Sequence, residues 1–133
     1  MITEWLITRT SFPKFWRWVA KVFRHCEVHP DAVIHPSIRF GHGGHGIVIG
    51  NCFIGKNVKI MHNVTLCNNP LAESDTQQHR SPIILDDVFI GCHSIIIGGV
   101  VIGKNSVVGA GSLISHDVPS NSTVYNKRLT ILK

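Results

Sequence analysis

The stretch that decides the fold spans residues 84–118 and reads ILDDVFIGCHSIIIGGVVIGKNSVVGAGSLISHDV. An aliphatic residue returns there at every sixth position, at Ile84, Ile90, Ile96, Ile102, Val108 and Ile114. Four residues after each comes a small or β-branched side chain, at Val88, Ser94, Val100, Ser106, Ser112 and Val118. Neither an α-helix nor a simple strand sustains this period. Short strands with a turn every six residues do, and the frequent glycine and asparagine residues suit such turns.

The same period runs through the earlier part of the chain. One run comprises Val48, Ile54, Ile60 and Leu66, with Cys52, Val58 and Val64 at the positions four residues later, and another comprises Val28, Ile34 and Phe40. Three six-residue faces make a triangular coil of 18 residues, and stacked coils pair through parallel backbone hydrogen bonds. The sequence therefore predicts an all-β parallel β-helix over residues 27–125.

The period breaks at two places. Phe40 and Val48 are eight residues apart rather than six, and the two extra residues fall in the stretch GHGGHG at 41–46. Leu66 and Ile84 are in phase, but the residues between them are mostly polar. We interpret residues 67–83 as a loop that projects from one corner, and long polar loops on rigid scaffolds often carry function.

The two ends of the chain differ from the repeats. Residues 1–26 are predicted to form an N-terminal helical cap, whose helix over 11–24 begins at Ser11 and carries an apolar stripe. This stripe suits the open end of the first coil, which stacked repeats must cover. Contact of the same basic helix with an anionic membrane surface is the less favoured alternative. Residues 126–133 form a basic C-terminal tail.

Composition supports a β-rich chain and narrows the possible partners. The 133 residues include 17 Ile and 14 Val but only 7 Leu and 4 Ala, and β-branched residues favour extended chain. The formal charge is +5, yet five of the basic residues precede residue 25, and aromatic and basic residues do not alternate as in single-strand binders. We therefore expect no nucleic-acid partner. The four cysteines form no C-x-x-C pair, so we expect reduced thiols. No apolar run is long enough for a signal peptide or a membrane span, so we expect a cytoplasmic protein.

The tandem repeat resembles that of the hexapeptide-repeat acyltransferases, and the closest resemblance is to serine O-acetyltransferases and their shorter relatives that acetylate sugars. The resemblance implies a left-handed coil, an exception to the usual right-handed crossover. It also implies a homotrimer with active sites between subunits.

Two residues match the catalytic pair of that family. A histidine in the first irregular coil acts there as general base, and an Asp fifteen residues earlier orients it. Glu27 stands at the second place in this chain and His42 at the first. Imidazole titrates near neutral pH, and a carboxylate on its far nitrogen fixes the tautomer. Glutamate is one methylene longer than the family's aspartate.

The resemblance also implies residues that contact the substrates. His79 and Arg80 resemble the family's Arg-His-Pro segment, which contacts the acceptor, although Ser81 stands where the family has its histidine. His62 and His45 are further candidates for the acceptor side. The donor would be acetyl-CoA, with no metal, and the predicted contacts are Gly91, Cys92, Gly109, Ala110, Gly111, Ser112, Lys127 and Arg128.

The acceptor is predicted to be a hydroxyl of a sugar or a surface-polysaccharide precursor. Serine enzymes of the family carry Asp directly before the catalytic histidine, where this chain has Gly41, and they also carry a long helical N-terminal domain. Serine acetylation is the first alternative. A zinc lyase of the γ-carbonic-anhydrase type and a non-catalytic binding module are alternatives of other classes; the lyases have two histidine ligands five residues apart, and no two histidines here have that spacing.

Overall fold

A computed structural model describes residues 22–71 and 80–126 and places fourteen short strands there in three parallel sheets. The first sheet contains β1 (Glu27–Val28), β4 (Val48–Ile49), β7 (Thr65–Cys67), β10 (Ile95–Ile97) and β13 (Leu113–Ile114). The second contains β2 (Val33–Ile34), β5 (Phe53–Ile54), β8 (Ile83–Ile84) and β11 (Val101–Ile102). The third contains β3 (Arg39–Phe40), β6 (Lys59–Ile60), β9 (Phe89–Ile90), β12 (Val107–Val108) and β14 (Thr123–Val124). From β1 to β13, every third strand therefore returns to the same sheet, and β14 follows β12 in the third sheet after an isolated bridge between Ile102 and Val118.

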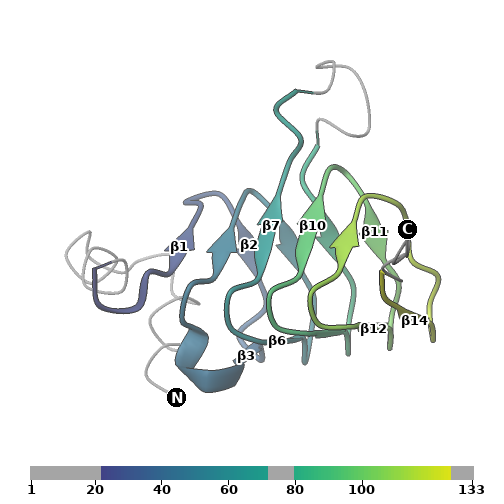
Figure 1. The fold of residues 1–133 in the computed structure, drawn as a ribbon, viewed down its shortest axis with the longest axis horizontal. Helices are drawn as coiled ribbons and strands as arrows, with labels where there is room; N and C mark the ends of the chain where they lie inside the picture. Colours follow the sequence, from purple (N-terminus) through teal and green to yellow (C-terminus); the bar gives the residue numbers. More distant parts are fainter. Residues whose placement is uncertain (1–21, 72–79, 127–133) are drawn as a thin grey trace, which may run out of the picture.

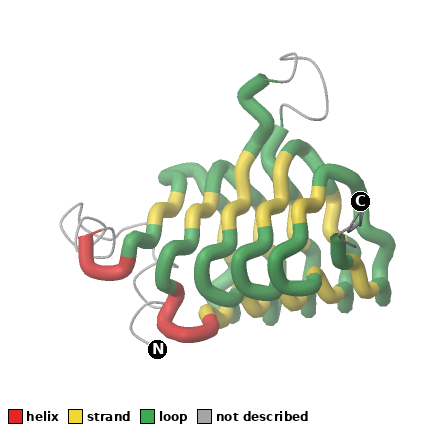
Figure 2. Tube along the Cα trace, in the orientation of Figure 1, coloured by secondary structure: helices red, strands yellow, loops and turns green. Residues whose placement is uncertain are grey.

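The coils stack as the repeat predicts, so that the chain winds into a triangular prism (Figures 1 and 2). The register is regular where the period of six is regular: Ile84 pairs with Ile102, and Ile90 with Val108. Each of these pairs is 18 residues apart in the sequence, which is one full coil. The parallel β-helix predicted from the sequence is confirmed by this pairing.

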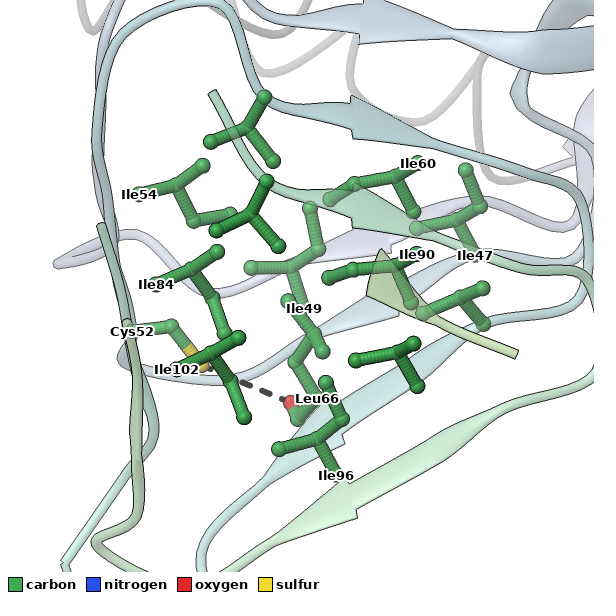
Figure 3. Close-up of a cluster of buried hydrophobic side chains, with 14 of the residues drawn as sticks. Ile47, Ile49, Cys52, Ile54, Ile60, Leu66, Ile84, Ile90, Ile96 and Ile102 are labelled. Atoms are coloured by element: carbon green, nitrogen blue, oxygen red, sulfur yellow. Dashed lines mark hydrogen bonds between the residues drawn. The ribbon is translucent and has the colours of Figure 1, made fainter. Parts of the chain in front are cut away.

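The interior of the prism is filled by the predicted aliphatic residues (Figure 3). All six members of the run from Ile84 to Ile114 are at most 1% exposed. The positions four residues later are buried as well, and three of them are serines whose hydroxyls donate to backbone carbonyls. Ser94 and Ser112 both donate to Gly109, at 3.0 and 2.7 Å, and Ser106 donates to Pro119 at 2.8 Å. These bonds offset the cost of burying a hydroxyl.

The repeat predicts that the Val48 side chain is buried in the prism, and this prediction is wrong. Val48 is 37% exposed, whereas Ile49 is 1% exposed and pairs with Leu66 in the first sheet. The reason lies in the turns on either side of β4. Gly46 has a φ of 65° in the irregular turn before the strand, and the Cys52 amide donates to the Gly50 carbonyl at 2.7 Å in a tight turn after it. The turn before β4 lengthens the spacing between successive buried residues. The turn after β4 shortens the next spacing, from Ile49 to Ile54, to five residues.

Parts of three predicted segments lie outside the described residues. Residues 22–24 are helical, but the rest of the helix predicted over 11–24 and its capping role are not described. The described arms of the 67–83 loop, residues 68–71 and 80–82, extend away from the corner between β7 and β8 (Figure 1). The tail with Lys127 and Arg128 is also outside. None of the helices in the described ranges could span a membrane.

Candidate active site

One corner of the prism carries the residues that the sequence singles out for acid–base chemistry. It consists of the turns that lead from β3, β6, β9 and β12 into β4, β7, β10 and β13. His42 stands in the first turn, His62 in the second and His93 in the third, and residues 109–111 form the fourth. We call this row of turns the histidine corner.

His42 is held in an unusual backbone conformation by the irregular turn η1 (Gly41–Gly44). Its φ of 50° and ψ of 34° are left-handed, a region that residues other than glycine rarely occupy. The Arg24 guanidinium donates to the Gly43 carbonyl at 2.6 Å, and His45 Nδ1 lies 2.8 Å from the His42 carbonyl oxygen. These two contacts fix the turn, and the His42 side chain remains exposed. His45 thus contacts the turn that carries His42.

His42, His62 and His93 form a column along the corner. The His42 and His62 ring centroids lie 5.1 Å apart with an interplanar angle of 84°, and those of His62 and His93 lie 5.2 Å apart at the same angle. His93 Nε2 is also 3.4 Å from the Asn63 side-chain nitrogen. His93 was not among the sequence candidates, because the 67–83 loop separates it from His62 by far more than one 18-residue coil.

Glu27 lies on β1, at the edge of the first sheet. Its backbone amide donates to the Ile47 carbonyl at 2.8 Å, and its register partner is Val48, which follows the turn of His42. The side chain is exposed. The first strand of the prism therefore places Glu27 beside the chain segment that leaves the histidine corner, and its action on His42 stays a prediction.

Arg80 lies on a different corner, between the first and second sheets. It lines a pocket of about 580 Å³ together with His29, Asn51, Asn68 and other residues at the base of the projecting loop. His42 precedes the strands of the first sheet, whereas Arg80 follows them. One chain thus places the predicted base and the predicted acceptor-binding arginine at opposite ends of the same strands. His79 is outside the described residues.

The small-residue turns beside His93 allow very close approach of backbones. A Cβ atom at Gly91 would stand 2.5 Å from the Ala110 nitrogen, so only glycine fits there. Gly111 has a φ of 67°, and a Cβ atom on it would meet nothing within 4 Å. Cys92 is half-buried and its carbonyl accepts the Gly111 amide at 2.8 Å, while Ser112 faces inward. The open side of Gly111 and the exposed Ala110 leave the backbone of this turn accessible to a ligand.

Burial keeps two cysteines protonated. It raises the pKa of the Cys26 thiol to about 11 and that of Cys52, which lines the Arg80 pocket, to about 12. Burial also raises the pKa of Cys67. A thiol is a much weaker nucleophile than a thiolate, so these three side chains are poorly suited to covalent catalysis. Within residues 22–71 and 80–126, no group of three or more His, Cys, Asp or Glu side chains could hold a metal ion.

Comparison with known proteins shows which proteins the chain resembles. Residues 81–116 match the model of the bacterial transferase hexapeptide, six repeats. Serine acetyltransferase from Bacillus subtilis strain 168 is 38% identical over 107 residues, which are 80% of this chain and 47% of that protein. The chain is thus similar to the hexapeptide-repeat acyltransferases. Serine acetyltransferase 4 of Arabidopsis thaliana is 41% identical over 80% of this chain and 28% of the relative.

Solved structures of acyltransferases share the fold of this chain. Neisseria gonorrhoeae serine acetyltransferase in complex with serine matches with a TM-score of 0.72 at 32% identity, over 95% of this chain and 51% of that one. Soybean serine acetyltransferase complexed with serine matches with a TM-score of 0.70 at 38% identity, over 81% and 43%. The left-handed β-helix predicted for the repeats is thereby confirmed. The chain spans about half the length of the first curated relatives it matches.

Proposed function

We propose that this acyltransferase moves an acetyl group from acetyl-CoA to a hydroxyl group, with His42 as the general base. The observation that carries the proposal is the position of His42. It is an exposed imidazole in the irregular coil, on the same corner as the small-residue turn at 109–111. An acid–base group and an accessible backbone surface for a thioester donor therefore lie along one edge of the prism.

The reaction needs one proton acceptor and no covalent intermediate on the protein. The neutral imidazole of His42 takes the hydroxyl proton, while the hydroxyl oxygen attacks the thioester carbonyl. The carbon–sulfur bond then breaks, and the His42 imidazolium returns the proton to the leaving thiolate of CoA. Backbone N–H groups aimed at the carbonyl oxygen would stabilise the negative charge that develops there.

The turns near His93 are the proposed donor surface. Gly91 and Ala110 pack their backbones together, and Gly111 leaves room for a ligand beside Ala110. A flexible pantetheine arm with its amide groups suits such a surface, because backbone groups can pair with amides at close range. Lys127 and Arg128 are proposed to meet the phosphates of CoA.

A complete site requires a neighbouring copy of the chain, which is the reason we propose a homotrimer. The outward face of the first sheet carries the exposed aliphatic residues Val48, Ile95 and Leu113, and that of the second carries Val33, Phe53 and Ile83. Two different apolar faces suit the head-to-tail contact of a cyclic trimer. Such a contact can bring the Arg80 pocket of one copy to the His42 of the next.

The first candidate acceptor is serine, because the relatives and structural neighbours reported above are named for serine acetylation. These relatives give no support to the sugar acceptor expected from the sequence. One observation still favours a sugar as second candidate. Gly41 stands directly before His42, so this position lacks the carboxylate expected to meet the amino group of serine.

The test is an acceptor screen with purified protein and acetyl-CoA, in which release of free CoA thiol is recorded for serine, homoserine and a panel of sugars. We expect one acceptor class to turn over, and His42→Ala to lower its rate by about 10²–10⁴-fold while circular dichroism and the melting temperature stay unchanged. Equal turnover by His42→Ala would disprove the assignment of the base. Thiol release with sugars alone would overturn the serine candidate.

A further inference from the structure

His93 stands between the proposed base and the proposed donor surface. His42 lies in the first turn of the histidine corner and His93 in the third, while residues 109–111 form the fourth. Successive coils are about 4.8 Å apart, so a donor held at the fourth turn is about 14 Å from the turn of His42. The rings of His42, His62 and His93 follow one another along this distance, at 5.1 and 5.2 Å between centroids. A donor arm that runs along the corner therefore passes His93.

The place of His93 in its turn requires a left-handed backbone. Ile95 pairs with Thr65 and with Leu113, which sets His93 level with Asn63 in the coil before and with Gly111 in the coil after. The φ angles of Asn63, His93 and Gly111 are 54°, 58° and 67°. Glycine adopts this conformation at the lowest cost, whereas a residue with a β-carbon loses free energy in it. The turn itself does not explain an imidazole at position 93.

The hydrogen bonds around His93 leave one ring nitrogen available. The His93 amide donates to the His62 carbonyl at 3.1 Å, and the Gly111 amide donates to the Cys92 carbonyl at 2.8 Å, so both backbone donors are used within the fold. The His93 side chain is exposed, and its Nε2 atom lies 3.4 Å from the Asn63 side-chain nitrogen. Within residues 22–71 and 80–126, its Nδ1 atom has no hydrogen-bond partner. This atom can pair with a ligand.

We propose that His93 binds the pantetheine arm of acetyl-CoA, with its Nδ1 atom paired to an amide group of the arm. The proposal rests on the proposed function, which places the thioester at His42 and the donor on the turn at 109–111. An amide group offers both a donor and an acceptor, so it can pair with either tautomer of a neutral imidazole. His93 takes no proton in the reaction. It selects donors that carry an amide along the arm behind the thioester.

Equilibrium binding of CoA, measured by isothermal titration calorimetry, tests this contact without any need for turnover. His93→Gly should raise the Kd of CoA by about 3–10-fold, the effect of one lost hydrogen bond. Its melting temperature without ligand should not fall, because glycine suits the left-handed φ. An unchanged Kd would overturn the proposal. A raised Kd together with a lower melting temperature would also overturn it, because lost structure would then explain the weaker binding.

Two other substitutions at position 93 separate hydrogen bonding from ring packing. His93→Asn keeps a short polar side chain and tolerates the left-handed backbone, whereas His93→Phe keeps a ring without polar atoms. We expect His93→Asn to bind CoA more tightly than His93→Phe does. If His93→Phe binds as tightly as the wild type, ring packing explains the contact and the proposal is wrong.

His25→Gly is the matched control. His25 is an exposed histidine with a φ of 51° that precedes β1, on the other side of the turn of His42 from residues 109–111. The substitution relieves the same backbone conformation away from the donor path, so the Kd of CoA should not change. Equal weakening by His25→Gly and His93→Gly would contradict a local contact at His93.

Steady-state kinetics supplies the catalytic readout. His93→Gly should raise KM for acetyl-CoA with little change in kcat and none in KM for the acceptor, because the contact holds the arm equally before and during transfer. A raised acceptor KM instead would place His93 on the acceptor side and refute the proposal. The two proposals fail in different ways. Absence of transfer to every acceptor would remove the proposed function and leave CoA binding to decide on His93, whereas an active enzyme whose Kd for CoA ignores His93 would overturn only this contact.

Discussion

Gly91 lies so close to Ala110 in the next coil that a Cβ atom at position 91 would stand 2.5 Å from the Ala110 nitrogen and 2.8 Å from its Cα. Both are backbone atoms, which cannot move without disturbing the ladder between β9 and β12. We expect Gly91→Ala to lower the free energy of unfolding by about 1–3 kcal/mol, as other overpacked sites do. Urea denaturation measures this value.

A glycine of the next turn along the same corner serves as the control. Gly111 has open space around a Cβ atom, and only its φ of 67° penalises a side chain. Gly111→Ala should therefore cost no more than about 1–2 kcal/mol, the price of a left-handed conformation. If both variants were as stable as the wild type, the close packing of these turns would be refuted.

Val107 and Val108 are neighbours in β12 that face opposite sides of the prism wall. Val108 is 0% exposed in the core and Val107 is 38% exposed. Val108→Ala removes two buried methyl groups and leaves a cavity, so it should lower the free energy of unfolding by about 2 kcal/mol or more. Val107→Ala, the same substitution one residue earlier, should cost far less. Equal losses, measured by chemical denaturation, would contradict the burial of the repeat.

Asp86 links stability to pH at another corner. The Lys56 backbone amide donates to Asp86 Oδ1 at 2.9 Å and the Lys104 ammonium lies 3.1 Å from Oδ2, and together they hold the pKa of this carboxyl below its usual value. Because the folded pKa is lowered, the carboxylate stabilises the fold above its ordinary pKa, and this contribution is lost as the pH falls through the folded value.

The expected outcome is a difference between variants in acid. Wild-type stability should fall as the pH drops below about 4, and Asp86→Asn should lack that part of the decline while being less stable at pH 7. Asp31→Asn, which changes an exposed aspartate at a different corner, is the matched control. Urea midpoints from pH 7 to pH 3 provide the measurement, and parallel curves for wild type and Asp86→Asn would rule out the linkage.

How far the sequence predicts the fold depends on the regularity of each turn. From Ile84 to Ile114 every turn has the same length, so a count of six locates each buried residue. Around β4 the count fails and selects Val48 instead of Ile49, because the turn before β4 is longer than the repeat requires and the turn after it is shorter, and the second change offsets only part of the first. Periodicity records the sum of such changes but not where each occurs.

A residue of the candidate site can be predicted only where a side chain suited to acid–base chemistry falls at a visible break in the six-residue repeat. His42 can be found from the irregular coil, whereas His93 cannot, since it meets His62 only after the intervening loop has been folded outward. Arg80 is predicted on the acceptor side, and the fold places it on a different corner from His42, at the other end of the strands of the first sheet. Contacts between coils or between chains cannot be predicted from the sequence of a single six-residue repeat.

Glu27 provides the last test, because its carboxylate is predicted to fix the tautomer of His42 and to stabilise the imidazolium formed during transfer. Glu27→Gln keeps the size of the side chain but removes its charge, so we expect kcat to fall by about 10–10²-fold, less than in His42→Ala, with little change in KM. Glu27→Asp shortens the chain to the family's residue and should retain more activity than Glu27→Gln. Kinetics of thiol release on the three variants measures this order. Full activity in Glu27→Gln would show that His42 works without this carboxylate.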